Sequence, residues 1–199
     1  ATFPLLTQSK IANAVVAGSE KITPEVAPYG MAIKSTSRQD VLQMIAASKA
    51  KGYKTIGIIH DDGVYAVERA KLVKEEADKA GITVVGEQSY KLFGTDMTAQ
   101  LTALKNLNPD VLIAFTTLPT DTGHILKGRD QLAWDPPIIG NSGAMVPKGA
   151  LAVAGPDGYH NVTGVVSASF AACTVDEIRP ATTEFIDAIA KAANAKPGD

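Results

Sequence analysis

The sequence predicts an α/β fold in which helices cover both faces of a doubly wound parallel sheet. From residue 55 onward, short apolar runs rich in Val and Ile alternate with longer stretches whose apolar residues recur at helical spacing. This alternation is typical of buried parallel strands joined by right-handed helical crossovers. The composition agrees with a globular domain, because 45% of the residues are hydrophobic and 20% are charged.

The chain before residue 55 predicts few regular elements. In order we expect a short strand at 3–6 with a polar tip at 7–10, irregular chain over 11–30, a short strand at 31–33, and a helix that begins near Ser37 and ends at Gly52. Two Gly and two Pro residues interrupt the irregular stretch. The helix begins with a sequence that resembles a capping box, and Gly52 takes the usual place of glycine after a helix.

The remaining elements repeat one unit, a strand followed by a helix. We expect the strands at 55–59, 82–90, 111–115, 138–139 and 162–166, and the helices at 64–80, 96–106, 120–132, 147–154 and 179–195. Gly81 ends the first of these helices, and prolines follow the next two. Five strands complete a doubly wound domain, so the first strand and the long connection look like part of another one.

Polar residues follow the predicted strands, at the edge of the sheet where ligands bind in open α/β folds. They are Asp61, Asp62, Tyr65, Thr116, Thr117, Asn141 and Ser142. We expect one residue of the Asp pair to cap the following helix, and Tyr65 to face this edge. The set holds hydrogen-bonding groups and one aromatic ring, without an activated nucleophile or an acid–base pair. It therefore favours binding over catalysis.

Three kinds of reactive site fit the sequence poorly. A phosphoacceptor site of the two-component receiver type needs an Asp after the third strand, where Thr116 and Thr117 stand. Residues 140–144, GNSGA, approximate the nucleophile elbow of hydrolases, but Pro147 places the next helix about five residues later. No glycine-rich dinucleotide or phosphate loop follows a strand, so we expect no nucleotide cofactor.

Cysteine, histidine and charge exclude further classes. Cys173 is the single cysteine and the three His lack metal-ligand spacing, so we expect no internal disulfide and no metal site. The formal net charge is −2 and the basic residues are scattered, which argues against nucleic acid and membrane surfaces. No apolar run approaches the roughly 18 residues of a membrane span. Ala1 reads as an internal start without a signal peptide.

The order of these pieces resembles a known family. The chain begins with FPLLTQS, a connection punctuated by Pro and Gly, MAIKSTSRQD and YKTIGIIHDDGVYAVERAKLVKEEADKAGITVVGEQSY. It continues in the same order and spacing with GTDMTAQLTALKNLNPDVLIAFTTLPTDTGHILKGRDQL, PPIIGNSG and GYHNVTGVV. Together these runs are similar to the Leu/Ile/Val-binding proteins, the solute-binding proteins of branched-chain amino acid ABC transporters.

The resemblance implies a type I periplasmic binding fold, in which two lobes close on a small solute and catalyse nothing. It also implies a periplasmic or lipid-anchored extracellular location and a membrane permease as partner. This chain would be a fragment: residues 1–35 a remnant of the N-terminal lobe and the inter-lobe connection, 36–170 the C-terminal lobe, and 171–199 a hinge-proximal segment and helix. We expect such a fragment to bind solute poorly, and its exposed lobe surface favours dimerisation.

The resemblance further implies which residues contact the solute. The candidates are Gln8, Ser9, Lys10, Asp62, Tyr65, Thr116, Thr117, Asn141 and Ser142. The first three match the N-terminal-lobe loop that usually holds the carboxylate and ammonium groups of the ligand, and Tyr65 matches an aromatic residue at the lobe junction. Family members often carry a Tyr in the loop of Thr116, and an acidic residue in the loop of Ser142.

These departures from the family pattern favour a particular solute. Lys10 supplies a cation, while no acidic residue stands at Ser142 to bind an ammonium group. We therefore expect a small carboxylate, aromatic or aliphatic, or another small polar solute, instead of leucine. Two alternatives to a solute-binding protein remain open. The main one is the ligand-sensing domain of a signalling receptor with the same fold, and the other is an enzyme.

Overall fold

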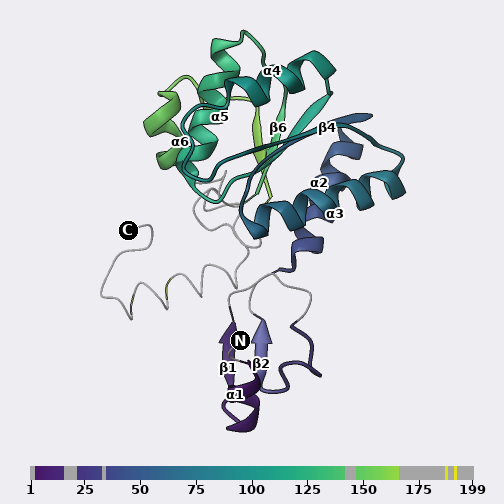
Figure 1. Ribbon diagram of the computed structural model, residues 1–199, viewed down its shortest axis with the longest axis vertical. Helices are drawn as coiled ribbons and strands as arrows, with labels where there is room; N and C mark the ends of the chain where they lie inside the picture. Colours follow the sequence, from purple (N-terminus) through teal and green to yellow (C-terminus); the bar gives the residue numbers. More distant parts are fainter. Residues whose placement is uncertain are drawn as a thin grey trace. The chain divides into compact units, whose positions relative to one another are not determined.

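The computed structural model describes residues 3–15, 22–32, 35–141, 147–165, 187 and 191. The chain divides into two compact units, residues 1–166 and 167–199. The described part of the first unit holds a five-stranded sheet with its helices and a two-stranded sheet near the N-terminus (Figure 1). None of the described helices is both long and apolar enough to cross a membrane.

The five-stranded sheet is parallel throughout, with the strand order β4-β3-β5-β6-β7. Its strands are β3 (Thr55–Asp61), β4 (Thr83–Tyr90), β5 (Val111–Phe115), β6 (Ile138–Gly140) and β7 (Val162–Gly164). In a doubly wound sheet of this order, the strand order reverses between the first and third strands, here β3 and β5, and ligands bind in the crevice outside that point. The predicted fold class is therefore confirmed.

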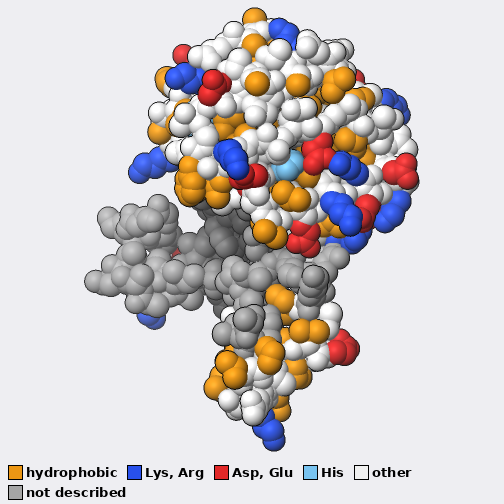
Figure 2. Space-filling view, in the orientation of Figure 1, with side chains coloured by type: hydrophobic (Ala, Val, Ile, Leu, Met, Phe, Trp, Pro, Cys, Tyr) orange, Lys and Arg blue, Asp and Glu red, His pale blue; other side chains and the backbone are white. Residues whose placement is uncertain are grey.

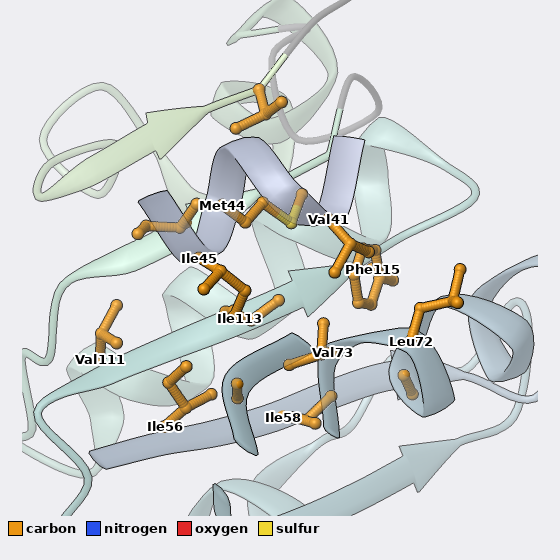
Figure 3. Close-up of a cluster of buried hydrophobic side chains, with 14 of the residues drawn as sticks. Val41, Met44, Ile45, Ile56, Ile58, Leu72, Val73, Val111, Ile113 and Phe115 are labelled. Atoms are coloured by element: carbon orange, nitrogen blue, oxygen red, sulfur yellow. The ribbon is translucent and has the colours of Figure 1, made fainter. Parts of the chain in front are cut away.

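Helices cover both faces of the sheet (Figure 1). One face carries α2 (Ser37–Ala50) and α3 (Val64–Ala80), and the other carries α4 (Thr98–Leu107), α5 (Pro119–Gln131) and α6 (Pro147–Ala154). Each layer buries its own cluster of apolar side chains against the strands, and Figure 3 shows the cluster under α2 and α3. Burying one Leu or Ile side chain contributes roughly 1.5–3 kcal/mol, so these clusters hold the layers together.

The strands show why their sequences read as continuous apolar runs. Successive side chains of a strand point to opposite faces, so Ile58 packs under α2 and α3 while Ile59 packs under the helices of the other layer. In β5, Ile113 and Phe115 join the first cluster, and Leu112 joins the second. Because both faces are covered, both sets of side chains must be apolar.

The helix boundaries follow from capping residues close to those predicted. Thr36 caps α2 through a capping box with Gln39, so the box begins one residue before the predicted start at Ser37. α3 spans the predicted range and ends at Gly81, whose φ of 72° is the left-handed conformation that glycine adopts easily. α4 begins at Thr98, two residues later than predicted. The side chain of Asp96, which precedes the helix, accepts the N–H of Thr98 at 2.8 Å.

The N-terminal part differs from the prediction. Residues 3–8 form a helix, α1 (Phe3–Gln8), where we predicted a strand, so that prediction is wrong. Proline is tolerated in the first helical turn, and an apolar run this short carries no period that separates helix from strand. The N–H groups of Ser9 and Ile11 bond back to the carbonyls of Leu5 and Leu6, which closes the helix end.

A two-stranded parallel sheet follows α1. It pairs β1 (Asn13–Val15), which was not predicted, with β2 (Gly30–Ala32), which overlaps the strand expected at 31–33. Its surroundings expose large apolar side chains, and Figure 2 shows hydrophobic side chains over this part of the surface. They include Leu5, Ile11, Val26 and Met31. Of the helix predicted at 179–195, only Asp187 and Lys191 are described, and both are helical.

Candidate functional site

Asp61 joins the two loops at the point where the strand order reverses. It is the last residue of β3 and is fully buried. One carboxylate oxygen accepts the N–H of Gly63 and the other accepts the N–H of Thr117, each at 2.8 Å. The loop after β3 is thereby tied to the loop after β5. The predicted cap is wrong, because Gly63 occupies the N-cap of α3 without a side-chain hydrogen bond.

Asp62 points to a different neighbour. Its Oδ1 accepts the N–H of Leu92 at 2.9 Å, and its Oδ2 lies 3.3 Å from Nζ of Lys91, both in the loop after β4. These contacts, with the Leu92 N–H first, lower the pKa of the Asp62 carboxyl. The two adjacent aspartates thus fasten the end of β3 to the loops on either side of it.

Thr116 and Asn141 are predicted site residues that the structure brings into contact. Oδ1 of Asn141 accepts the N–H of Thr116 at 3.2 Å, and Nδ2 of Asn141 donates to the Thr116 carbonyl at 3.0 Å. The hydroxyl of Thr116 also bonds to that of Thr122 at 2.9 Å. Both predicted residues are buried, so they brace the ends of β5 and β6. Thr117, by contrast, is exposed.

Tyr65 lies in the first turn of α3, at the same edge of the sheet, and is half-buried. The guanidinium carbon of Arg69, one turn further along the helix, lies 3.3 Å from the centroid of the Tyr65 ring. Arg69 is fully buried, and its Nη2 bonds to Oδ2 of Asp40 in α2 at 2.9 Å. The aromatic residue of the site is therefore backed by a buried ion pair.

Sequence reasoning missed a buried pair beside Asp61. The hydroxyl of Tyr90, at the end of β4, donates to Oδ2 of Asp121, in the first turn of α5, at 3.4 Å. Burial, and then the negative charge of Asp61, raise the pKa of Asp121, and burial raises the pKa of Tyr90. The one sequence signal, an acidic residue in a first helical turn, equally suits the helix dipole.

The other predicted residues lie elsewhere. Gln8 ends α1, and Ser9 and Lys10 form the turn after it, all three with exposed side chains. They belong to the N-terminal part, which is described separately from the sheet. Ser142 lies outside the described residues. The structure therefore gathers the candidates that follow β3, β5 and β6, and the hydrogen bonds above join these three loops.

The chemistry of this edge suits binding. It presents the hydroxyl of Thr117 and the aromatic ring of Tyr65 beside a carboxylate, Asp61, whose two oxygens each accept a backbone N–H group. Among the described residues, no group of three or more His, Cys, Asp and Glu side chains could hold a metal ion. These are groups that orient a small polar molecule.

Comparison with known proteins finds a matching family model and similar individual proteins. A family model described as periplasmic binding protein matches residues 1–199. The Leu/Ile/Val-binding protein homolog 8 of Brucella abortus is 29% identical over 137 residues, a match that covers 67% of this chain and 32% of that protein.

Solved structures share the fold at lower identity. A branched-chain amino acid ABC transporter protein from Thermus thermophilus, with bound valine, has a TM-score of 0.78 at 15% identity and matches 98% of this chain and 50% of its own. An ABC transporter solute-binding protein from R. palustris, in complex with benzoate, has a TM-score of 0.77 at 18% identity, with coverages of 99% and 53%. The chain therefore spans about half the length of these solved chains.

Proposed function

The chain belongs to the periplasmic binding protein family, and on that premise we propose that it is the solute-binding component of an ABC importer. Membership confirms the family resemblance and the lobe fold. In the proposed role the protein works outside the cytoplasm, hands its solute to a membrane permease and catalyses nothing. Residues 36–170 form the C-terminal lobe, residues 1–35 the end of the N-terminal lobe with the connection, and 171–199 the hinge-proximal segment.

Our choice of solute rests on the contacts of the acidic groups at the carboxyl edge of the sheet. Asp61 accepts two backbone N–H groups, and Asp121 is buried against Tyr90. Asp62 is held by the loop after β4. Asp61 and Asp121 are buried and bonded within the protein, and the more exposed Asp62 already contacts Leu92 and Lys91. We infer that none of the three pairs with the ammonium group of an amino acid.

A small carboxylate suits the remaining groups. The candidate contacts include the exposed hydroxyl of Thr117, the ring of Tyr65 and, in the N-terminal part, the exposed ammonium group of Lys10. Hydroxyl and ammonium groups donate to a carboxylate, and an aromatic solute stacks on a tyrosine ring. We infer that Gln8, Ser9 and Lys10 hold the carboxylate while Tyr65 and Thr117 contact the body of the solute.

Proteins of this fold bind both kinds of solute. The T. thermophilus structure holds valine, whereas the R. palustris structure holds benzoate. The engaged carboxylates of the present chain favour the second kind. Benzoate is therefore the probe with which we would begin.

The proposal is tested by titrating the isotope-labelled chain with benzoate, 3,4-dihydroxybenzoate, valine and leucine and following its NMR resonances, because this method detects weak binding. We expect the two benzoates to shift resonances of Tyr65 and Thr117, and Tyr65→Ala to weaken this response about tenfold. Shifts at these residues with leucine or valine, and none with either benzoate, would contradict the carboxylate assignment.

A further inference from the structure

We propose that Arg69 is a positioning residue for the solute site: held by Asp40, its guanidinium fixes the aromatic ring of Tyr65 at the carboxyl edge of the sheet. The inference rests on the proposed function, because it takes Tyr65 as a solute contact. Arg69 itself is fully buried, so it acts on the solute only through Tyr65.

The geometry of α3 brings the two side chains together. Arg69 follows Tyr65 by four residues, and a long helical side chain points back toward the N-terminus of its helix. The guanidinium carbon reaches 3.3 Å from the centroid of the tyrosine ring. Stacking of this kind is worth about 0.5–2 kcal/mol, with the larger values at desolvated sites. The ring is therefore held from the side that faces the protein interior.

A second helix fixes the guanidinium in turn. Nη2 of Arg69 bonds to Oδ2 of Asp40 at 2.9 Å, and Asp40 lies in the first turn of α2. The other oxygen of Asp40 accepts the hydroxyl of Ser35, which precedes the N-cap of α2. The contacts run from Ser35 through Asp40 and Arg69 to Tyr65, so the start of α2 and the start of α3 are held as one unit behind the ring.

Stability alone does not explain an arginine at this position. Nε and Nη1 of Arg69 are buried without a hydrogen-bond partner, and an unsatisfied buried donor costs free energy. Its neighbours on this face of α3 include Ala66, Ala70 and Val73 in the core, while Glu76, two turns further along, is the other buried charged residue of the helix. A well-packed hydrophobic residue often replaces a buried ion pair without loss of stability. The contact with the Tyr65 ring therefore offers the better explanation for an arginine at position 69.

The test uses Arg69→Met and Asp40→Asn in the full chain. Methionine keeps the length and the apolar packing of the arginine side chain but removes the stacked cation, and asparagine removes the charge that holds it. The ring resonances of Tyr65, identified with Tyr65→Phe, are recorded first without solute. Titration with benzoate follows. We expect both variants to shift the ring resonances and to weaken benzoate binding about threefold to tenfold.

Arg129→Met provides a matched control. Arg129 is also a fully buried helical arginine, paired with Asp135 at 3.0 Å, but it lies in the last turn of α5. Because helices and strands run in opposite directions in such a sheet, that turn is at the edge remote from the solute site. Its substitution should change stability without moving the Tyr65 resonances or the benzoate response.

The outcomes are separable. Unchanged Tyr65 resonances in a folded Arg69→Met chain would overturn the positioning role, as would an equal shift in Arg129→Met. If Arg69→Met does not fold, Arg69→Lys, which keeps the charge but loses the planar stack, takes its place with the same expectation. If the native chain gives no response to benzoate, the proposed solute is wrong, while the ring resonances without solute still decide the role of Arg69.

Discussion

Among single residues, Asp61 does most to shape the candidate site, because its two oxygens accept the N–H groups of Gly63 and Thr117. An asparagine offers one acceptor oxygen and turns an NH2 group toward the second N–H. We therefore expect Asp61→Asn to lower the free energy of unfolding by about 1–3 kcal/mol, the cost of an unsatisfied buried donor. Urea denaturation measures this. Asp62→Asn is the control, since Asp62 is partly exposed, and an equal loss in both variants would contradict the argument.

The Asp110 carboxylate contributes to the stability of the protein in a way that depends on acid pH. It accepts the N–H groups of Lys54 at 2.7 Å and Thr55 at 2.9 Å, and these bonds lower the pKa of its carboxyl. A lowered pKa in the folded state adds stability above the unfolded pKa of about 4, and this is lost as the pH falls through the folded value.

We therefore expect Asp110→Asn to unfold at a lower temperature at pH 7. It should also lose less stability than the native chain between about pH 4 and pH 2, where the native chain protonates the Asp110 carboxylate and the variant has no such group. Thermal unfolding followed by circular dichroism at several pH values checks both expectations. Parallel curves for the two proteins over that range would show that the bonds of Asp110 carry no such linkage.

The residues of the site were predictable only in part. A pair of acidic residues after a strand indicated the carboxyl edge of the sheet as the candidate site, because strand ends and ligand sites coincide in parallel sheets. The roles within the pair were not predictable, since Asp61 bonds to Thr117, a residue 56 positions away. The contact of Tyr90 with Asp121 spans 31 positions. Contacts of this kind arise from the sheet order, which no local spacing encodes.

At the scale of elements, close packing between α5 and α6 depends on Gly123. A Cβ added to Gly123 would lie 2.5 Å from the backbone carbonyl oxygen of Ala150 in α6, whereas one added to Gly128 would meet only the movable end of the Leu101 side chain at 2.7 Å. Alanine normally stabilises a helix by about 1 kcal/mol relative to glycine.

This contrast gives a matched pair of variants in one helix. We expect Gly123→Ala to destabilise the protein by about 1–3 kcal/mol, because the backbone of α6 must move. Gly128→Ala should change stability by less than about 1 kcal/mol, because the leucine can rotate and alanine favours the helix. Denaturant midpoints of the two variants test this, and equal destabilisation would exclude backbone contact as the cause.

The elements themselves were more predictable than their contacts. α3, β5 and α6 have the predicted ranges, because long helical periodicity, Gly81 and short apolar runs act locally. α1 was predicted as a strand because four apolar residues fit either period. The tertiary contacts of such a segment decide whether it forms a helix or a strand. These contacts cannot be read from the residues next to it in the sequence.

At the scale of the whole molecule, the lobe and the N-terminal part make separate contributions. Both apolar clusters draw their members from residue 41 onward. The N-terminal part exposes several of its larger apolar side chains, and Leu5 and Met31 are each 65% exposed. The stability of the lobe should therefore depend little on this part, whereas solute binding should depend on it if Gln8, Ser9 and Lys10 hold the carboxylate.

Removal of residues 1–32 tests this division. We expect the shortened chain to unfold within a few degrees of the full chain, because no member of either cluster is lost, but to bind benzoate at least about tenfold more weakly. Lys10→Gln in the full chain should reproduce much of that loss without changing stability, and Lys49→Gln, an exposed lysine in α2, should reproduce none. Full benzoate affinity in the shortened chain would place the whole site on the lobe. The carboxylate would then have to be held by the loops after β3, β5 and β6 alone.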